Sequence, residues 1–164
     1  MKRTALISPC GTYRYRLERI WNDTLPRIHW IMLNPSTADA TQDDNTIRRV
    51  ISFSQSWGYG SAVVLNLFAY RTPHPKHLQQ ANDPVGPRND KHLAELNAPI
   101  IAAWGAHSFA ISRATEVLTL LSRQRNQSSG TLVLCLGQNK NGSPKHPLYV
   151  SGESQLKKLK RKML

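Results

Sequence analysis

The chain contains the run Ile28-His29-Trp30-Ile31-Met32-Leu33-Asn34-Pro35, in which a short apolar segment ends at a polar pair. Two later runs have the same form, since Ala62-Val63-Val64-Leu65 ends at Asn66 and Leu132-Val133-Leu134-Cys135-Leu136 ends at Gly137. Short, continuous apolar runs are typical of strands buried on both faces of a sheet. In an open α/β sheet, ligands bind beyond the carboxyl ends of the strands. The sequence therefore predicts strand ends that deliver polar side chains to one site.

Segments with helical character separate these runs. Asp44-Asn45-Thr46 can cap a helix that continues to Trp57, and residues 107–121 carry apolar side chains at helical spacing. Residues 89–96 predict a short helix, and the basic residues 153–163 predict a last one. Strands that alternate with helices favour a mostly parallel sheet covered on both faces.

We therefore expect an α/β fold with three layers, α/β/α, around a mainly parallel four-stranded central sheet. Its strands are predicted at residues 28–33, 61–65, 99–104 and 131–136. The long proline-rich segment 66–87 has no regular period, and a loop of that length is usually functional or misassigned.

An N-terminal β-hairpin is expected ahead of this sheet. Pro9-Cys10-Gly11-Thr12 supplies a turn, and residues 13–18 alternate aromatic or apolar side chains with charged ones. A length of 164 residues makes one domain over residues 1–164 the default. We place the hairpin at residues 1–22 and a basic C-terminal helix or tail at residues 151–164.

Charge points to a polyanionic partner. The chain has 22 Lys and Arg against 10 Asp and Glu, a formal net charge of +12. Such an excess favours nucleic acid, with DNA as the leading partner. The run Lys157-Lys158 and its basic neighbours account for part of the charge, and a solvated tail that aids solubility explains that part equally well.

The few cysteines and the short apolar runs indicate the cellular compartment. Cys10 and Cys135 are too few for a disulfide scaffold, so we expect reduced thiols in a cytoplasmic protein. No apolar run approaches the ~20 residues needed to span a bilayer, so no membrane association is expected. We expect a monomer.

Three polar residues are candidates for a site, and each has a structural alternative. Asn34 begins Asn34-Pro35-Ser36, which is also a common turn sequence. Asn66 offers a donor and an acceptor suited to the edge of a base, but asparagine also simply stops strands. His146 lies beyond a strand in a polar loop with two lysines, where a donor to a developing anion or a phosphate contact is plausible. A lone histidine is more often structural.

Metal and cofactor motifs are weak. His74 and His77 have His-x-x-His spacing in a proline-rich loop, without a helix or a clear third ligand. Gly58-Tyr59-Gly60 precedes a strand, so it is no dinucleotide fingerprint. We therefore expect neither a metal nor a cofactor.

Taken in order, these motifs resemble the uracil-DNA glycosylase superfamily. Met32-Leu33-Asn34-Pro35 is similar to its first motif, and Val63-Val64-Leu65-Asn66 to its second strand with a base-reading asparagine. Ala103-Trp104-Gly105-Ala106 is similar to the end of its third strand, and His146-Pro147-Leu148 to its final His-Pro loop. More closely, the stretch from Leu33 to Asp39 resembles a family of small bacterial and phage proteins, domain-of-unknown-function family 1643.

The superfamily resemblance implies a uracil-DNA glycosylase-like fold and a DNA glycosylase-type hydrolase that flips a base out of the stack. Asn34 and His146 would be catalytic: Asn34 would position the water, and His146 would donate to the base oxygen. Asn66 would read the base, and Leu148 or Tyr149 would wedge into the stack. Further substrate contacts would come from Pro35, Ser36, Phe68, Trp104, Gly105 and Pro147. Phosphate contacts would come from Arg71, Lys140 and Lys145.

Departures from the superfamily pattern leave three hypotheses. Asn34 is an amide where a carboxylate would activate water better, and Ser36 and Leu148 replace residues that some members use. The leading hypothesis is hydrolysis of the N-glycosidic bond of a base in DNA or a related nucleoside. The alternatives are a non-catalytic nucleic-acid-binding module with a similar pocket and an enzyme acting on a small nucleotide-like substrate.

Overall fold

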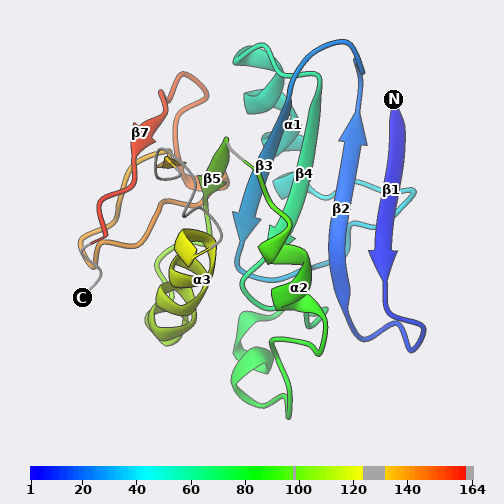
Figure 1. Ribbon diagram of the computed structural model, residues 1–164, viewed down its shortest axis with the longest axis vertical. Coiled ribbons are helices and arrows are strands. Elements are labelled where there is room, and N and C mark those ends of the chain that lie inside the picture. The colour runs from blue at the N-terminus through cyan, green and yellow to red at the C-terminus, as the bar shows by residue number, and fades with distance from the viewer. Residues whose placement is uncertain (98, 124–131, 162–164) are drawn as a thin grey trace.

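The computed structural model of the chain describes residues 1–97, 99–123 and 132–161 (Figure 1). Thr131 and residues 162–163, which fall in the last predicted strand and helix, lie outside the described residues. The strands are β1 (Lys2–Ile7), β2 (Arg14–Ile20), β3 (Arg27–Met32), β4 (Ser61–Asn66), β5 (Ile100–Ala102), β6 (Val133–Cys135) and β7 (Lys157–Lys158). The helices are α1 (Asn45–Ser56), α2 (Asn89–Ala94) and α3 (Ile111–Arg123), with 3₁₀ turns at Pro75–Gln79, Ser108–Ala110 and Pro147–Tyr149.

All seven strands form one mixed sheet in the order β1-β2-β4-β3-β5-β6-β7. β3 pairs in parallel with β4 and with β5, and β5 pairs in parallel with β6. β1 and β2 form an antiparallel hairpin whose second strand joins β4, and β7 is antiparallel to β6. The carboxyl ends of β3, β4, β5 and β6 therefore lie at the same edge of the sheet (Figure 1).

Helices cover both faces of the sheet (Figure 1). Alternate residues of each buried strand point to opposite faces. Ile31 and Val63 pack with α2 and α3 on one face, whereas Trp30 and Val64 pack with α1 on the other. Double-sided burial explains why these strands read as continuous apolar runs.

The sheet differs from the predicted four mainly parallel strands. It has seven strands of mixed direction, because the N-terminal hairpin extends it beside β4 and a C-terminal strand extends it beside β6. The helix predicted over residues 153–163 is wrong for its described part, where β7 pairs with β6. Leu156 and Leu159, three residues apart, pack on opposite layers, as side chains at odd spacing do in extended chain. Pairing at the exposed edge of β6 outweighs the local helical spacing.

The start of α1 follows the predicted cap. Asp44 is the N-cap residue, and its Oδ1 accepts a hydrogen bond from Ile47 N at 2.8 Å. Ile47, Val50, Ile51 and Phe53 then face the sheet. A side-chain cap of this kind satisfies one of the free amides of the first turn.

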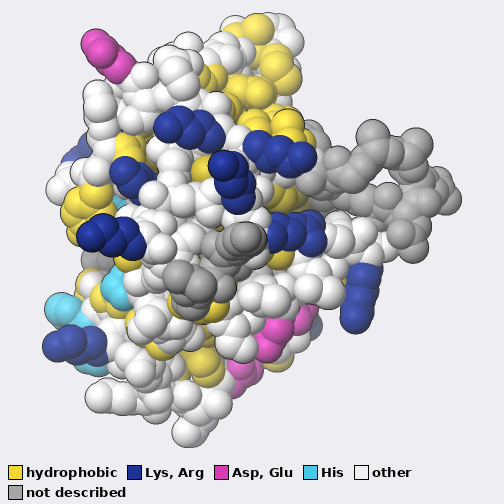
Figure 2. Space-filling model, turned by 90° about the vertical axis from the view of Figure 1, so that its left-hand side faces the viewer, with side chains coloured by type: hydrophobic (Ala, Val, Ile, Leu, Met, Phe, Trp, Pro, Cys, Tyr) yellow, Lys and Arg dark blue, Asp and Glu magenta, His cyan; other side chains and the backbone are white. Residues whose placement is uncertain are grey.

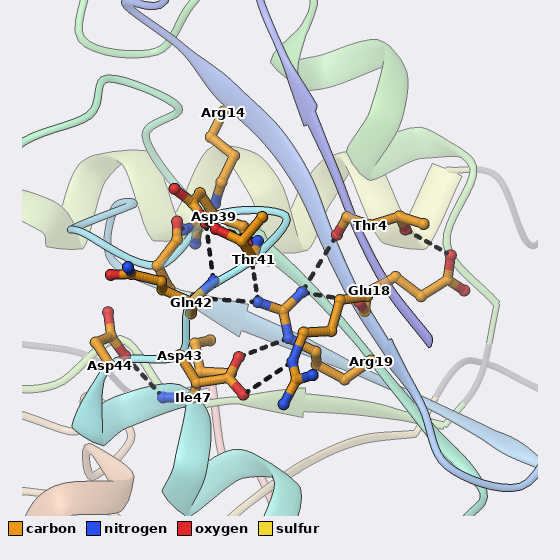
Figure 3. A network of polar contacts seen from close by, with 12 residues as sticks. Thr4, Arg14, Glu18, Arg19, Asp39, Thr41, Gln42, Asp43, Asp44 and Ile47 are labelled. Carbon is orange, nitrogen blue, oxygen red and sulfur yellow. Dashed lines mark hydrogen bonds and ion pairs between the residues drawn. The ribbon is translucent and has the colours of Figure 1, made fainter. Parts of the chain in front are cut away.

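Arg19 of β2 ties the hairpin to the loop before α1 (Figure 3). Its side chain is 1% exposed, and its Nε donates to Asp43 Oδ1 at 2.6 Å. The remaining donors reach backbone carbonyls of Thr4, Glu18, Asp39 and Gln42. The buried guanidinium is thus both charge-paired and fully hydrogen-bonded.

The surface at the β7 side carries scattered Lys and Arg side chains and few acidic ones (Figure 2). Both β7 lysines are exposed there. Within the described ranges, the structure contains no helix of the length and hydrophobicity that a bilayer crossing requires.

Replacing Arg19 with alanine should destabilise the fold strongly. The change leaves Asp43 and several buried carbonyls without their donor, and removal of one member of a buried ion pair costs about 3–5 kcal/mol. Urea denaturation should show a loss of this size. Arg48→Ala is the control, because Arg48 is exposed and bonds only Asn45 within its helix. A loss below about 1 kcal/mol in Arg19→Ala would contradict the role given to this network.

Candidate functional site

A cavity of about 720 Å³ lies at the carboxyl ends of β3, β4 and β5, next to the loop that follows β6. Its size is in the usual range for small-molecule and cofactor sites, about 300–1,000 Å³. The predicted site residues that line it are Asn34, Ser36, Asn66, Trp104, Gly105, Lys145, His146 and Leu148. The structure therefore brings the two asparagines and the histidine together at one cavity.

Five predicted site residues lie outside this lining: Pro35, Phe68, Arg71, Lys140 and Pro147. Phe68 is 7% exposed and packs against Phe109 in the core, so its position is structural. The Pro147 carbonyl accepts a hydrogen bond from Arg49. Arg71 donates to the Gly11 carbonyl at 3.0 Å. Phosphate contacts from Arg71 or Lys140 would be made outside the cavity and stay a prediction.

Asn34 is held in one orientation by its amide nitrogen. Nδ2 donates to the carbonyl of Pro35 at 2.9 Å and to that of Thr72 at 2.8 Å. Both amide hydrogens are therefore used, and Oδ1 is left as an acceptor. Thr72 N in turn donates to the Pro35 carbonyl at 2.9 Å, which ties the loop after β3 to the proline-rich segment. Asn34 can accept a hydrogen bond from a ligand or a water but has no amide donor to spare.

Asn66 is the most unusual group in the site. It is 1% exposed, and neither Nδ2 nor Oδ1 has a hydrogen-bond partner among the described residues. Its backbone is fixed, because Asn89 of α2 donates to the carbonyls of Asn66 and Leu67 and Arg113 of α3 donates to that of Leu67. Buried polar groups are nearly always paired, and leaving one unpaired costs about 1–3 kcal/mol. A ligand with one donor and one acceptor side by side would satisfy this amide.

His146 presents a hydrogen-bond donor. Its Nδ1 accepts from Leu148 N at 3.2 Å, so the neutral ring carries its hydrogen on Nε2. Burial lowers the pKa of His146 to about 4, and repulsion from His107 adds to this shift while Asp44 opposes it. His146 is therefore neutral at pH 7 and offers Nε2–H without bringing a charge.

Backbone contacts fix the histidine loop against β5. Gly105 has φ +85°, a conformation that favours glycine, and its N donates to the Pro144 carbonyl at 3.0 Å. Lys145 N donates to the Gly137 carbonyl at 2.9 Å, which closes the loop onto the end of β6. A side chain at position 105 would also approach the Cβ of His146. The glycine after Trp104 thus permits the positive φ with which its amide reaches the histidine loop.

Arg49 of α1 clamps the same loop from the other side. Its Nε donates to the Pro147 carbonyl at 3.1 Å and its Nη2 to the Val150 carbonyl at 2.6 Å. The guanidinium carbon lies 4.7 Å from the centre of the Phe53 ring, an arrangement that restrains the side chain. No local pattern predicts this contact, because about one hundred residues separate its partners.

The cavity is also lined by Asp44 and by Arg14, Thr72 and His107, and no local pattern in the sequence singles out the last three. Asp44 was recognised as a helix cap, which uses Oδ1, but its place at the cavity depends on how α1 packs. It is the one acidic residue in the lining within the described part of the chain. Arg14 was one of many arginines in the sequence, and only the packing of β2 distinguishes it.

Asp39, His74 and His77 lie outside the cavity lining. Asp39 accepts from Thr41 N, Thr41 Oγ1 and Gln42 N, and these bonds lower its pKa to about 2. The rings of His74 and His77 lie 5.2 Å apart. No group of three or more potential metal ligands occurs in the ranges that the structure describes.

The lowered pKa of His146 should make stability depend on pH. Between about pH 6.5 and 4, the unfolded chain binds a proton that the folded protein does not, so stability falls as the pH falls through this window. We expect the free energy of unfolding of the wild type to drop relative to that of His146→Gln across this range in urea titrations. Shifts at His29 and His92 occur in both proteins and cancel. Parallel pH curves for the two proteins would contradict a lowered pKa of His146 in the folded protein.

Loss of the Arg49 clamp should loosen the histidine loop. In Arg49→Ala, we expect amide hydrogen exchange at residues 146–150 to become faster, because two carbonyl contacts and the stacking on Phe53 are removed. Arg48→Ala, one residue away on the exposed side of α1, should leave exchange in this segment unchanged. Equal exchange in wild type and Arg49→Ala would show that other contacts hold the loop.

Comparison with known proteins identifies a family and no characterised relative. No curated protein matches the chain. No solved structure matches it either. A match to the family described as "Protein of unknown function (DUF1643)" extends over residues 14–148, which includes the hairpin strand β2 and every strand end at the cavity. Since this match covers most of its length, the chain belongs to that family.

Proposed function

We propose that this protein is a glycosylase-like enzyme that hydrolyses the N-glycosidic bond of a base in DNA or a related nucleoside. The observation that carries the proposal is the buried, unpaired amide of Asn66. A base presents a donor and an acceptor side by side, as this amide does. Asn34 Oδ1 and His146 Nε2–H complete a lining with an acceptor and a neutral donor.

The proposed reaction transfers the sugar from the base to water. The bond between C1′ and the base nitrogen breaks, its electron pair leaves with the base, and a water oxygen bonds to C1′. The water loses one proton and the base finally gains one, so atoms and charge balance. Such reactions pass through an oxocarbenium-like state, and both the cationic sugar and the anionic leaving group need stabilisation.

Each role falls to a residue of the cavity. Asn34 Oδ1 accepts a hydrogen bond from the attacking water and orients it. His146 donates through Nε2 to an oxygen of the base that becomes negative as the bond breaks. The Asp44 carboxylate stabilises the developing positive charge on the sugar, supplying the acid that the first motif lacks. Asn66 binds the edge of the base.

The mouth of the cavity suits a polymeric substrate. Leu148 and Tyr149 line the cavity and are 42% and 83% exposed, although both are large apolar or aromatic side chains. Extrusion of a base from a duplex costs a few kcal/mol, which inserted side chains can offset. The net charge of +12 favours a polyanion. These features favour DNA as the source of the base.

The test is turnover by the purified full chain. Single-stranded and duplex oligonucleotides carrying uracil, hypoxanthine, hydroxymethyluracil or mismatches are incubated and assayed for abasic sites, and the matching nucleosides and 5′-monophosphates for free base. Product from at least one substrate is expected. If no substrate is cleaved while salt-sensitive DNA binding persists, the protein is a binding module and the enzyme proposal fails. Absence of both would leave a small substrate of another kind.

Variants at the site should lose activity and stay folded. We expect Asn34→Ala and His146→Ala each to lower kcat by about 10²-fold or more, since single positioned groups contribute this much. Asp44→Ser should lose activity with little change in melting temperature, because serine also caps helices. His74→Ala, an exposed histidine outside the lining, is the control. Full activity in His146→Ala, or unfolding of Asn34→Ala, would argue for structural roles instead.

A further inference from the structure

Three arginines are buried in the part of the chain that the structure describes, and they differ in how their charge is compensated. Arg14, Arg19 and Arg113 are 3%, 1% and 7% exposed. Arg19 pairs with Asp43, and Arg113 pairs with Asp90 and Glu116. No acidic side chain of the described residues lies within ion-pair distance of Arg14, which also differs in lining the cavity.

Half of the Arg14 guanidinium makes no hydrogen bond to the described residues. Its Nη1 donates to the Ala38 carbonyl, the one side-chain hydrogen bond that it makes to the described part of the chain. Nε is buried and has no partner there. The edge formed by Nε–H and Nη2–H therefore keeps its two donors unused within this part of the chain. Two parallel donors on this planar edge match two oxygens of a phosphate or carboxylate.

A register shift in the hairpin turns Arg14 toward the cavity. Arg16 pairs with Leu6 and Arg14 with Ile7, so two positions on β2 oppose one step on β1 at Tyr15. In a regular strand, Arg14 and Arg16 would face the same side. The shift instead puts Arg14 on the side of Ala38 and α1, whereas Arg16 contacts Glu18. Bulges are common next to active sites, where they redirect a side chain.

The charge of Arg14 is retained although its surroundings disfavour it. Burial lowers its pKa to about 10, so it stays protonated at neutral pH. The charges of Asp44 and Asp39 raise the pKa of Arg14, and those of Arg71 and Arg19 lower it. The Asp39 carboxylate accepts its hydrogen bonds from Thr41 and Gln42 and makes none with Arg14. Figure 3 shows the Arg14 side chain reaching the turn of Asp39, whose carbonyl also accepts a hydrogen bond from Arg19.

We propose that Arg14 binds the phosphate group of a nucleotide whose base lies against Asn66 in the same cavity. This inference rests on the proposed function and names the part of the substrate that Arg14 recognises. Arg14 and Asn66 are both more than nine-tenths buried, both have unpartnered atoms, and both line the cavity. The phosphate belongs either to a free nucleoside 5′-monophosphate or to a DNA strand, and the experiment distinguishes these sources.

The experiment measures binding by calorimetry at low salt. The probes are nucleosides of uracil, hypoxanthine and hydroxymethyluracil, their 5′-monophosphates, and single-stranded oligonucleotides with the same bases. Wild type is compared with Arg14→Met, which removes the charge at similar length, and with Arg14→Lys, which keeps the charge without the two-donor edge. Arg27→Met is the control, because Arg27 lies at the opposite, amino end of β3 and is half exposed.

We expect Arg14→Met to weaken binding of a phosphorylated probe about tenfold or more, with nucleoside affinity changed less than twofold. Arg14→Lys should lose less than Arg14→Met, and Arg27→Met should match wild type. An effect on 5′-monophosphates identifies a free nucleotide, and an effect on oligonucleotides alone identifies a strand phosphate. Unchanged binding in Arg14→Met, or no binding of any phosphorylated probe by wild type, overturns the inference.

Folding and turnover separate this inference from the proposed function. Burial of a charge without an ion-pair partner costs free energy. Relief of this cost should offset the lost hydrogen bond to Ala38, so the melting temperature of Arg14→Met should equal or exceed that of wild type. A lower melting temperature would mean that the charge is structural, which overturns the inference. Binding that depends on Arg14 without bond cleavage rejects only the proposed function. Cleavage of nucleotides at the wild-type rate and KM in Arg14→Met rejects only the role of Arg14.

Discussion

Parallel pairing on both sides of β3 is the constraint from which the site follows. Because β4 and β5 run in the same direction as β3, the chain must leave all three strands at one edge of the sheet. The pairing of Met32 with Asn66 then sets Asn34 beyond one strand while Asn66 still lies inside the next. A slip of one residue would exchange the two faces of β4 and move Val63 and Leu65 out of the layer that they now fill. Burial of the sheet and placement of the site therefore have the same cause.

The backbone around the cavity, the frame of the site, is held by side-chain hydrogen bonds, whereas the Asn66 amide inside it has no partner among the described residues. Asn89 and Arg113 satisfy the carbonyls at the end of β4, and Arg49 satisfies those of the histidine loop. The Asn66 side chain, held by this frame, has no partner of its own among the described residues. A rigid frame with free polar groups binds a ligand without first breaking internal hydrogen bonds, and it binds at less entropic cost.

Local signals in the sequence were enough for most elements. The apolar runs predicted β3 and β4, and Asp44 predicted the start of α1, because burial and capping act within a few residues. The rule that sites lie at the carboxyl ends of strands placed Asn34 and Asn66 together. Contacts between distant segments were not predictable. β7 depends on the open edge of β6, which overrode the helical spacing of Leu156 and Leu159. The orientation of Arg14 depends on one register shift that alternation alone does not show.

A carboxylate from another element accompanies the Asn34 amide in the cavity. An amide cannot remove a proton from water, and the bond pattern around Nδ2 leaves it only as an acceptor. Asp44 brings a carboxylate to the same lining from a different element, the N-terminus of α1. His146 is neutral because partial burial lowers its pKa. Its Nε2–H can therefore donate more strongly as the leaving group becomes negative, with no prior ion pair to break. In the proposed reaction, orientation of the water and stabilisation of the cation are therefore divided between Asn34 and Asp44.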